Sequence, residues 1–278
     1  RYASEKGINM LDCWMADPKS RNIIGEGIKE NRDQWFIQGH IGSTWKDGQY
    51  FRTREMKYVR PAFEDLLKRL QTDYIDLGMI HYVDSEEEWE KIQHSDYLDY
   101  VMELKEKGVI RHIGMSSHTP RVVERALDLG ILDLLMFSIN PGYDYHHGNY
   151  AIGSAEERMA LYRRCQAEGV GISVMKAFSG GQLLDAKTSP FGQALTKPQC
   201  IQYALDKPGV VAVLPGFGSR EEMEEVLEYF DTPEEVRDYS AISAFAPRET
   251  LGRCVYCKHC HPCPAGLDIG LINKYYDL

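Results

Sequence analysis

Seven short apolar runs alternate with longer segments of helical periodicity, and this repeat constrains the fold more than any other feature of the chain. Continuously apolar runs are typical of parallel strands that are buried on both faces. The segments between them carry charged faces, as expected for helices that cover such a sheet. We therefore predict strands over residues 9–12, 35–40, 74–81, 110–117, 134–139, 171–177 and 211–216, with helices over 60–70, 97–107, 121–129, 155–168 and 221–229.

The chain length of 278 residues suits a single (β/α)8 TIM barrel, which typically has roughly 250 residues. Such a barrel closes with eight strands, so we expect that the first strand and most of its helix precede residue 1. A seven-stranded open sheet is the alternative. The repeat stops near Pro247, which predicts a barrel over residues 1–247 and a separate cysteine-rich segment over 248–278.

Composition indicates an intracellular protein with small-molecule rather than polyanionic partners. The net charge of −10 argues against binding to nucleic acid or to an anionic membrane surface. The chain has no apolar run of about 18 residues and no signal-peptide pattern. Cys13, Cys165 and Cys200 lie singly and far apart, unlike the cysteines of a secreted disulfide framework. We predict a soluble, cytoplasmic protein.

Four cysteines at three-residue steps, followed by a proline, dominate the C-terminal segment. The pattern resembles the bacterial iron–sulfur run, with the last gap one residue shorter. Pro262 and Pro264 exclude a regular helix, so a tight loop can bring the thiolates together. We predict a [4Fe–4S] cluster, with a tetrahedral zinc site as the first alternative and disulfides as the second. The candidate ligands are Cys254, Cys257, Cys260 and Cys263.

Polar residues end most of the predicted strands. In barrels of this type the active site lies at the carboxyl ends of the strands, so these residues are candidates for one shared pocket. Helix capping is the alternative role for such strand-end residues. The polar residues are Asp12, His40, His81, Ser116, Ser117, Asn140 and Lys176, and Gly216 with Gly218 lie at the end of the last predicted strand.

Several of these strand ends resemble motifs of the aldo-keto reductases over nearly the whole chain. The motifs are Gly-Ile-Asn-Met-Leu-Asp12, Asp-Tyr-Ile-Asp-Leu-Gly-Met-Ile-His81, Ile-Arg-His-Ile-Gly-Met-Ser116-Ser117 and Val-Leu-Pro-Gly216. The stretch Val-Met-Lys176-Ala-Phe-Ser-Gly-Gly and the cysteine run resemble the subgroup with a C-terminal ferredoxin-like extension. This subgroup usually carries a second cysteine run, so we expect the extension to be incomplete in this chain or to hold one cluster at most.

The resemblance implies a (β/α)8 barrel that reduces carbonyl compounds with NADPH through an aspartate, a tyrosine, a lysine and a histidine. Asp12 matches the aspartate and His81 matches the histidine, whereas Asp17 and His40 occupy the tyrosine and lysine positions. An ionised Asp17 has no proton to give near neutral pH, so His40 or His81 would replace the tyrosine as acid. The usual mechanism of aldehyde reduction would therefore be altered.

The resemblance also indicates residues that would bind a nicotinamide coenzyme. Ser116 and Ser117 match the pair that holds the carboxamide, and Lys176 stands where an aromatic residue commonly stacks on the ring. Ser219 can cap a helix whose backbone N–H groups, together with Arg220, would meet a phosphate. The candidate coenzyme-binding residues are Ser116, Ser117, Asn140, Lys176, Gly216, Gly218, Ser219 and Arg220.

These patterns together predict an oxidoreductase with an atypical active site made of Asp12, His40, His81 and Asp17. It would bind NADP(H), act on a small carbonyl-type substrate, and exchange electrons with an iron–sulfur cluster and a redox partner protein. Two alternatives have the same fold. One is a dehydratase or isomerase that uses the two histidines and Asp17, and the other is a non-catalytic binding or electron-carrier protein.

Overall fold

The computed structural model describes residues 2–245, 254, 260 and 263–276. These residues divide into two compact units, which we describe separately. The first unit contains Arg1–Ser117 and Arg125–Leu134, and the second contains His118–Glu124 and Leu135–Leu278. The predicted boundary near Pro247 lies outside the described residues.

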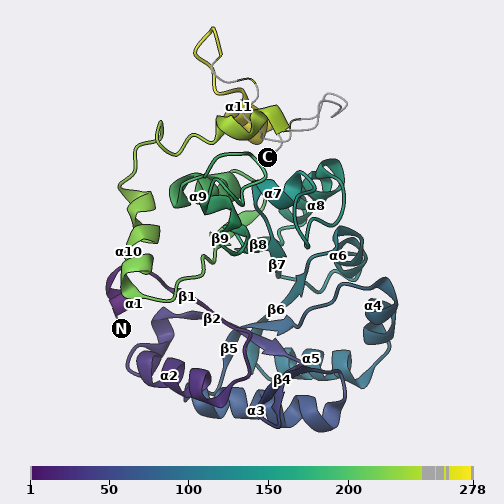
Figure 1. Cartoon of the computed structure of the whole chain (residues 1–278). Coiled ribbons are helices and arrows are strands. Elements are labelled where there is room, and N and C mark those ends of the chain that lie inside the picture. The colour runs from purple at the N-terminus through teal and green to yellow at the C-terminus, as the bar shows by residue number, and fades with distance from the viewer. Residues whose placement is uncertain (1, 246–253, 255–259, 261–262, 277–278) are drawn as a thin grey trace. The chain divides into compact units, whose positions relative to one another are not determined.

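The first unit is built on four neighbouring parallel strands in the order β1-β2-β5-β6 (Figure 1). The unit also contains a two-stranded antiparallel hairpin and helices that precede or follow the strands. The strands are β1 (Met10–Cys13), β2 (Phe36–Ile41), β5 (Ile75–Ile80) and β6 (Ile110–Ser117), and the hairpin is β3 (Ser43–Lys46) with β4 (Gln49–Arg52). The helices are α1 (Tyr2–Glu5), α2 (Pro18–Ile28), η1 (Arg32–Gln34), α3 (Met56–Leu70), α4 (Glu86–Gln93) and α5 (Asp96–Glu106).

The second unit has the strand order β7-β8-β9, with β8 and β9 paired in parallel. Its strands are β7 (Leu134–Ser138), β8 (Gly171–Met175) and β9 (Val210–Val213). Its helices are α7 (Pro141–Asp144), α8 (Ala155–Ala167), η2 (Ser179–Leu184), α9 (Lys197–Leu205), α10 (Arg220–Leu227), η3 (Glu228–Phe230), η4 (Ser240–Phe245) and α11 (Ile269–Tyr276). Helix α6 (Pro120–Leu127) and strand β7 have residues in both units.

All seven predicted strands are confirmed, with shifts of a few residues at their ends. The central strands show the burial on both faces that the prediction assumed: every residue of β5 is buried, and so are five of the six residues of β2. An eighth strand of this set is not among the residues that the structure describes. The hairpin β3–β4 was not predicted, and it contributes to the site described below.

Helix α3 packs closely against strand β2 and so fixes the strand end that carries His40. Gly39 makes this approach possible, because a methyl group there would come within 2.9 Å of Leu66 Cδ2 and 3.0 Å of Ile75 Cγ2. Leu66 and Ile75 are completely buried. Burying such apolar side chains contributes about 1.5–3 kcal/mol each, so the strand is held firmly next to the catalytic candidates.

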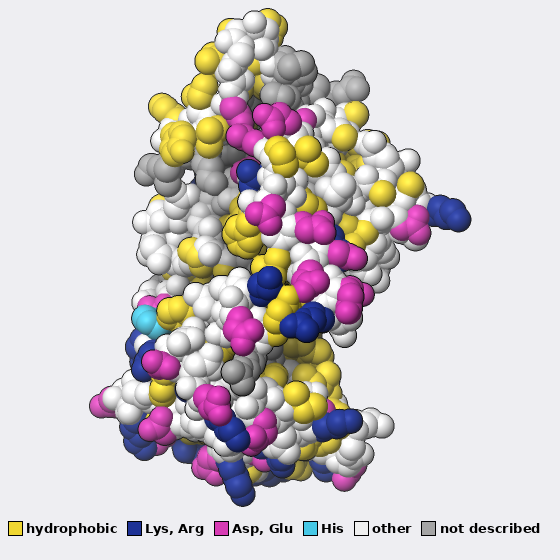
Figure 2. All heavy atoms as spheres, turned by 90° about the vertical axis from the view of Figure 1, so that its left-hand side faces the viewer, with side chains coloured by type: hydrophobic (Ala, Val, Ile, Leu, Met, Phe, Trp, Pro, Cys, Tyr) yellow, Lys and Arg dark blue, Asp and Glu magenta, His cyan; other side chains and the backbone are white. Residues whose placement is uncertain are grey.

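Two properties of the described residues concern the surface of the molecule. Among the described residues, no helix is long and apolar enough to cross a membrane. On the face drawn in Figure 2, acidic and basic side chains are interspersed with one another. Such mixed charge does not single out a binding face for a polyanion.

Candidate active site

Three of the predicted catalytic residues lie on one face of the first unit because of the strand register. Asp12 pairs with Gln38 across β1 and β2, and His40 pairs with Met79 across β2 and β5. Side chains two residues apart on a strand share a face, so Gln38 and His40 lie on the same side, as do Met79 and His81. The two-residue step from each strand to the next therefore places Asp12, His40 and His81 along a diagonal line across the carboxyl ends of the three strands.

A continuous series of hydrogen bonds joins these side chains and ends on a fourth residue. Asp12 Oδ1 lies 2.8 Å from His40 Nε2, and His40 Nδ1 lies 2.7 Å from His81 Nδ1. His81 Nε2 lies 2.6 Å from the hydroxyl of Tyr50. The rings of the two histidines cross at 82° with centroids 4.8 Å apart. We call Asp12, His40, His81 and Tyr50 the histidine row.

Burial decides which parts of the histidine row a ligand can reach. His40 and His81 are 2% and 5% exposed, whereas Tyr50 at one end is 37% exposed. The side chain of Asp12, at the other end, is 16% exposed. The row thus connects two accessible ends through two buried imidazoles.

The surroundings favour neutral forms of the two groups at the Tyr50 end. Burial, His40, Arg54 and Arg52 together hold the pKa of His81 well below 6.5, so this imidazole is neutral near neutral pH. Burial also raises the pKa of Tyr50 above its ordinary 10.0, against the opposing effect of Arg52 and Arg54. The Tyr50 hydroxyl therefore keeps its proton over the physiological range.

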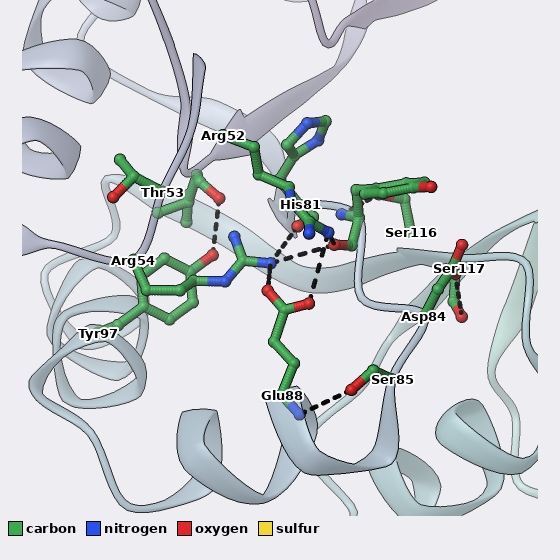
Figure 3. A network of polar contacts seen from close by, with 12 residues as sticks. Arg52, Thr53, Arg54, His81, Asp84, Ser85, Glu88, Tyr97, Ser116 and Ser117 are labelled. Carbon is green, nitrogen blue, oxygen red and sulfur yellow. Dashed lines mark hydrogen bonds and ion pairs between the residues drawn. The ribbon is translucent and has the colours of Figure 1, made fainter.

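Two arginines clamp the hairpin to the loop that carries His81 (Figure 3). Arg54 donates to the carbonyl of His81, and Arg52 Nη1 donates to the carbonyl of Tyr82 over 2.5 Å. Glu88 of α4 forms ion pairs with both guanidinium groups, with N···O distances of 3.1 Å to Arg54 and 3.4 Å to Arg52. Because Tyr82 has a left-handed φ of +47°, these contacts also stabilise a backbone conformation that non-glycine residues rarely adopt.

Sequence reasoning missed Tyr50, although the hairpin that carries it has a recognisable signal. Asp47 and Gly48 connect β3 to β4 and have φ values of +50° and +78°. Positive φ at both central residues is the type I′ turn, for which Asp-Gly between alternating strand residues is a strong indicator. The hairpin places Tyr50 opposite Trp45 and brings its ring to 5.6 Å from that of Trp14.

Asp17, which the sequence predicts as a catalytic residue, caps a helix in the described contacts. It is the N-cap of helix α2, where its Oδ2 accepts from the backbone N–H of Ser20 over 2.9 Å and from the Ser20 hydroxyl over 2.6 Å. The hydrogen bonds from Ser20 lower the pKa of Asp17. The carboxylate is thus kept ionised as a cap, which is a poor state for a proton donor.

Ser116 and Ser117, the predicted carboxamide-binding pair, are buried at the end of β6. Ser116 Oγ accepts from the backbone N–H of Tyr82 over 2.8 Å, and Ser117 Oγ donates to Asp84 over 3.1 Å. Because Ser116 is the acceptor in its bond to Tyr82, its own hydroxyl hydrogen can point toward a ligand. Ser116 therefore suits an amide oxygen better than Ser117 does.

The remaining candidates for coenzyme binding lie in the second unit. Asn140 caps α7 by accepting from Tyr143 N, and it donates to the carbonyl of Lys176 over 2.9 Å. Lys176 has a left-handed φ of +59°, and its Nζ lies 2.6 Å from His118 Nε2 and 3.4 Å from the centroid of the Tyr150 ring. Lys176 thus belongs to a polar cluster with His118 and Tyr150.

Gly216, Gly218, Ser219 and Arg220 precede or begin helix α10 as predicted, but a carboxylate already lies there. Ser219 caps the helix, and Glu222 Oε2 accepts from the backbone N–H of Gly218 over 2.6 Å. A phosphate at this terminus would have to displace Glu222, because two anions would repel each other at such a distance.

The cysteines fall into two groups with different properties. Burial raises the pKa of the thiols of Cys13, Cys165 and Cys200 to about 12, so these three remain protonated core residues. Of the predicted metal ligands, Cys257 lies outside the described residues, and Cys254, Cys260 and Cys263 are partly or fully exposed. Within the described part of the chain, no group of three or more His, Cys, Asp or Glu side chains is arranged to hold a metal ion.

Comparison with known sequences gives one consistent result. A sequence model described as the aldo/keto reductase family matches residues 1–199. The aldo-keto reductase YhdN of Bacillus subtilis is 35% identical over 121 residues, which are 42% of this chain and 35% of that protein. The uncharacterized oxidoreductase YqkF of the same organism is 33% identical over 126 residues, covering 44% of this chain and 40% of that protein. The matched region is thus less than half the length of either relative.

Comparison with solved structures supports the same fold. An aldo-keto reductase from Bacillus halodurans, in its holo form, superposes with a TM-score of 0.70 at 22% identity, covering 88% of this chain and 85% of that one. An aldo-keto reductase from Klebsiella pneumoniae in complex with NADPH superposes with a TM-score of 0.60 at 18% identity, covering 88% and 82% of the two chains. At these identities the likeness establishes the barrel-like α/β fold.

Proposed function

Because this chain belongs to the aldo/keto reductase family, we propose that it reduces the carbonyl group of a small molecule with NADPH. The observation that carries the proposal is the histidine row, in which Asp12, His40 and His81 are hydrogen-bonded in series at the carboxyl ends of three strands. Fold alone would not support a reaction, because one fold hosts many activities. Carbonyl reduction requires a proton from the protein, and the histidine row supplies one close to its solvent-accessible end.

The coenzyme proposal is supported at the nicotinamide end by Ser116. Its hydroxyl is held by the backbone of Tyr82 in an orientation that leaves the hydrogen available to a carboxamide oxygen. At the N-terminus of α10 the fit is poorer, because Glu222 accepts from the amide that a phosphate would use. When bound, the nicotinamide coenzyme would supply the hydride, and the residues of this chain would position the carbonyl and deliver the proton.

Aldehyde-dependent oxidation of NADPH tests the proposal directly. We expect purified protein to oxidise NADPH in the presence of an aromatic aldehyde such as nitrobenzaldehyde, and His81→Ala to lower the rate by about 100-fold or more. The same NADPH titration followed by fluorescence, without aldehyde, reports coenzyme binding separately from catalysis. A protein that binds no NADPH and consumes none with a panel of aldehydes and ketones would contradict the proposal.

The cysteine run supports a second, independent proposal, an iron–sulfur cluster in the segment 248–278. Its support is the spacing of Cys254, Cys257, Cys260 and Cys263, since thiolates at two-residue gaps are the ligands of such clusters. The described cysteines do not by themselves bring three ligands together, so no step of the reduction is assigned to a cluster.

Anaerobic purification of protein with and without Cys263→Ser tests this second proposal. A brown colour with visible absorbance that the substitution abolishes would support the cluster, and a redox partner protein would then be worth seeking. A colourless protein with about one zinc ion per chain would favour the tetrahedral site. A protein without either metal after reconstitution would rule out both.

A further inference from the structure

We propose that Tyr50 is the catalytic proton donor to the carbonyl oxygen of the substrate, an inference that rests on the reductase function proposed above. Tyr50 stands on the hairpin β3–β4, thirty-three residues beyond position 17, where the resemblance expects the donor tyrosine. The inference therefore assigns the missing hydroxyl to a different element of the fold.

Accessibility within the histidine row points to Tyr50. Asp12, as a carboxylate, accepts hydrogen bonds and has none to donate. Both imidazoles are at most 5% exposed, and each of their ring nitrogens is in a hydrogen bond. Tyr50 is the member that combines an O–H group with an exposed ring, at 37% exposure. A carbonyl oxygen approaching this end of the row would meet the phenol before it could meet either histidine.

The hydrogen bonds of the row can run in two directions that differ by one proton. With Asp12 ionised and both histidines neutral, Tyr50 donates to His81, His81 donates to His40, and His40 donates to Asp12. With one added proton, His40 is an imidazolium that donates both to Asp12 and to His81. His81 Nε2–H then donates to the Tyr50 oxygen, and the Tyr50 hydrogen is released toward the substrate.

The added charge resides on His40 rather than on His81 because of their neighbours. His40 lies 2.8 Å from the carboxylate of Asp12, which stabilises a positive ring. His81 is buried and lies between His40 and the guanidinium of Arg54, and these surroundings lower its pKa. His40 thus takes over the cationic role that the resemblance gives to lysine.

The position of the phenol is fixed by contacts that do not involve the side chains of the two histidines. The Asp47-Gly48 turn sets the register of the hairpin, and Arg52 and Arg54 bind it to the carbonyls after β5. Glu88 holds both guanidinium groups in turn, as Figure 3 shows for its contact with Arg54. A proton donor must be held within hydrogen-bond reach of its acceptor, and this clamp provides that constraint.

The proposed step balances as follows. The carbonyl carbon gains the hydride from the nicotinamide coenzyme, the C=O π bond breaks, and the oxygen forms its O–H bond with the Tyr50 proton. NADPH is oxidised to NADP⁺, and the carbonyl is reduced to an alcohol. The phenolate is stabilised by His81 Nε2–H and regains its proton through His40 from the solvent-accessible end at Asp12.

Tyr50→Phe, with Tyr58→Phe as a matched control, tests the proposal in the full-length chain. Tyr58 of α3 packs edge-on against Phe51, which lies on the same hairpin as Tyr50. The described contacts of Tyr58 do not include either histidine. We expect Tyr50→Phe to lower kcat at least about 100-fold, with little change in KM or in the NADPH affinity measured by fluorescence, and Tyr58→Phe to retain kcat. Tyr50→Phe should also shift the imidazole ¹⁵N resonances of His81, whereas Tyr58→Phe should not.

Each outcome has a defined meaning. If the unaltered protein reduces aldehydes and Tyr50→Phe retains kcat within about threefold, Tyr50 is not the donor although the reductase function stands. Loss of NADPH binding in Tyr50→Phe would also overturn the proposal, since it would assign Tyr50 to coenzyme binding. Unshifted His81 resonances would refute the contact itself, whether or not the variant is active. An unaltered protein that consumes no NADPH with any carbonyl compound refutes the reductase function, and the donor role with it.

Discussion

His40 Nδ1 lies 2.7 Å from His81 Nδ1, a separation that requires one imidazole to donate a hydrogen bond to the other. The two nitrogens cannot both carry hydrogen, so the protonation state of one ring dictates the direction of the bond to the other. An imidazole nitrogen can be a hydrogen-bond donor or acceptor, whereas a lysine ammonium only donates, so an added proton on this pair can reverse the hydrogen bonds of the histidine row.

The first prediction concerns pH dependence. Because donation by Tyr50 requires the added proton on His40, kcat for aldehyde reduction should fall as the pH is raised. Asp12 and His81 contact His40 in the row, and Tyr50, Arg52 and Arg54 lie beyond His81. Steady-state rates measured across the neutral and alkaline range check the direction.

His40→Lys is the informative variant for this prediction. A lysine ammonium keeps its charge to about pH 10, so the decline should move to higher pH. His40→Asn, which cannot carry the charge, should be slow at every pH. A decline at the same pH in the protein with and without His40→Lys would show that another group controls the rate.

The second prediction concerns Asp17. Asp17→Ala removes the acceptor for the Ser20 N–H at the start of α2, so it should lower Tm by about 2–4 °C. Asp17→Asn keeps an acceptor oxygen and should lower Tm by less. Both variants should retain the reductase activity of the folded protein, and a loss of activity without a loss of Tm would restore a catalytic role for Asp17.

The sequence identified residues at strand ends better than residues on inserted elements. Asp12, His40 and His81 follow apolar runs whose parallel arrangement is visible in the pattern, so their convergence follows from strand register. Tyr50 is separated from every predicted strand, and only the folded hairpin turns it back onto His81. For Asp17 the position relative to a motif suggested chemistry, and the structure adds a contact that the motif did not indicate, the N-cap of α2.

The third prediction uses two glycines of the same helix. In α2, a methyl group on Gly25 would lie 2.0 Å from the backbone carbonyl oxygen of Arg69, whereas one on Gly27 would meet nothing within 4 Å. Gly25→Ala must therefore separate α2 from α3 and should destabilise the protein by about 1–3 kcal/mol. Gly27→Ala should stabilise it by about 0.5–1 kcal/mol, because alanine is the better helix former. Urea denaturation of the two variants should give changes of opposite sign, and equal changes would contradict the close helix contact.

The fourth prediction concerns a buried carboxylate in the second unit. Asp144 accepts from Arg158 Nε over 2.7 Å, from Tyr162 over 2.8 Å and from Tyr203 over 2.7 Å. Arg158 is completely buried, so Asp144→Asn leaves its charge without a counter-ion and should cost about 3–5 kcal/mol of unfolding free energy.

Tyr162→Phe is the matched control, because it removes one hydrogen bond and leaves the ion pair in place. Its expected cost is about 1.5–3 kcal/mol, the range for a hydrogen bond to a charged group. Asp144→Asn should therefore be the more destabilising of the two in urea denaturation. If the two variants lost equal stability, most of the contribution of Asp144 would come from its hydrogen bond with Tyr162. The ion pair with Arg158 would then not be the main electrostatic contribution to the stability of this core.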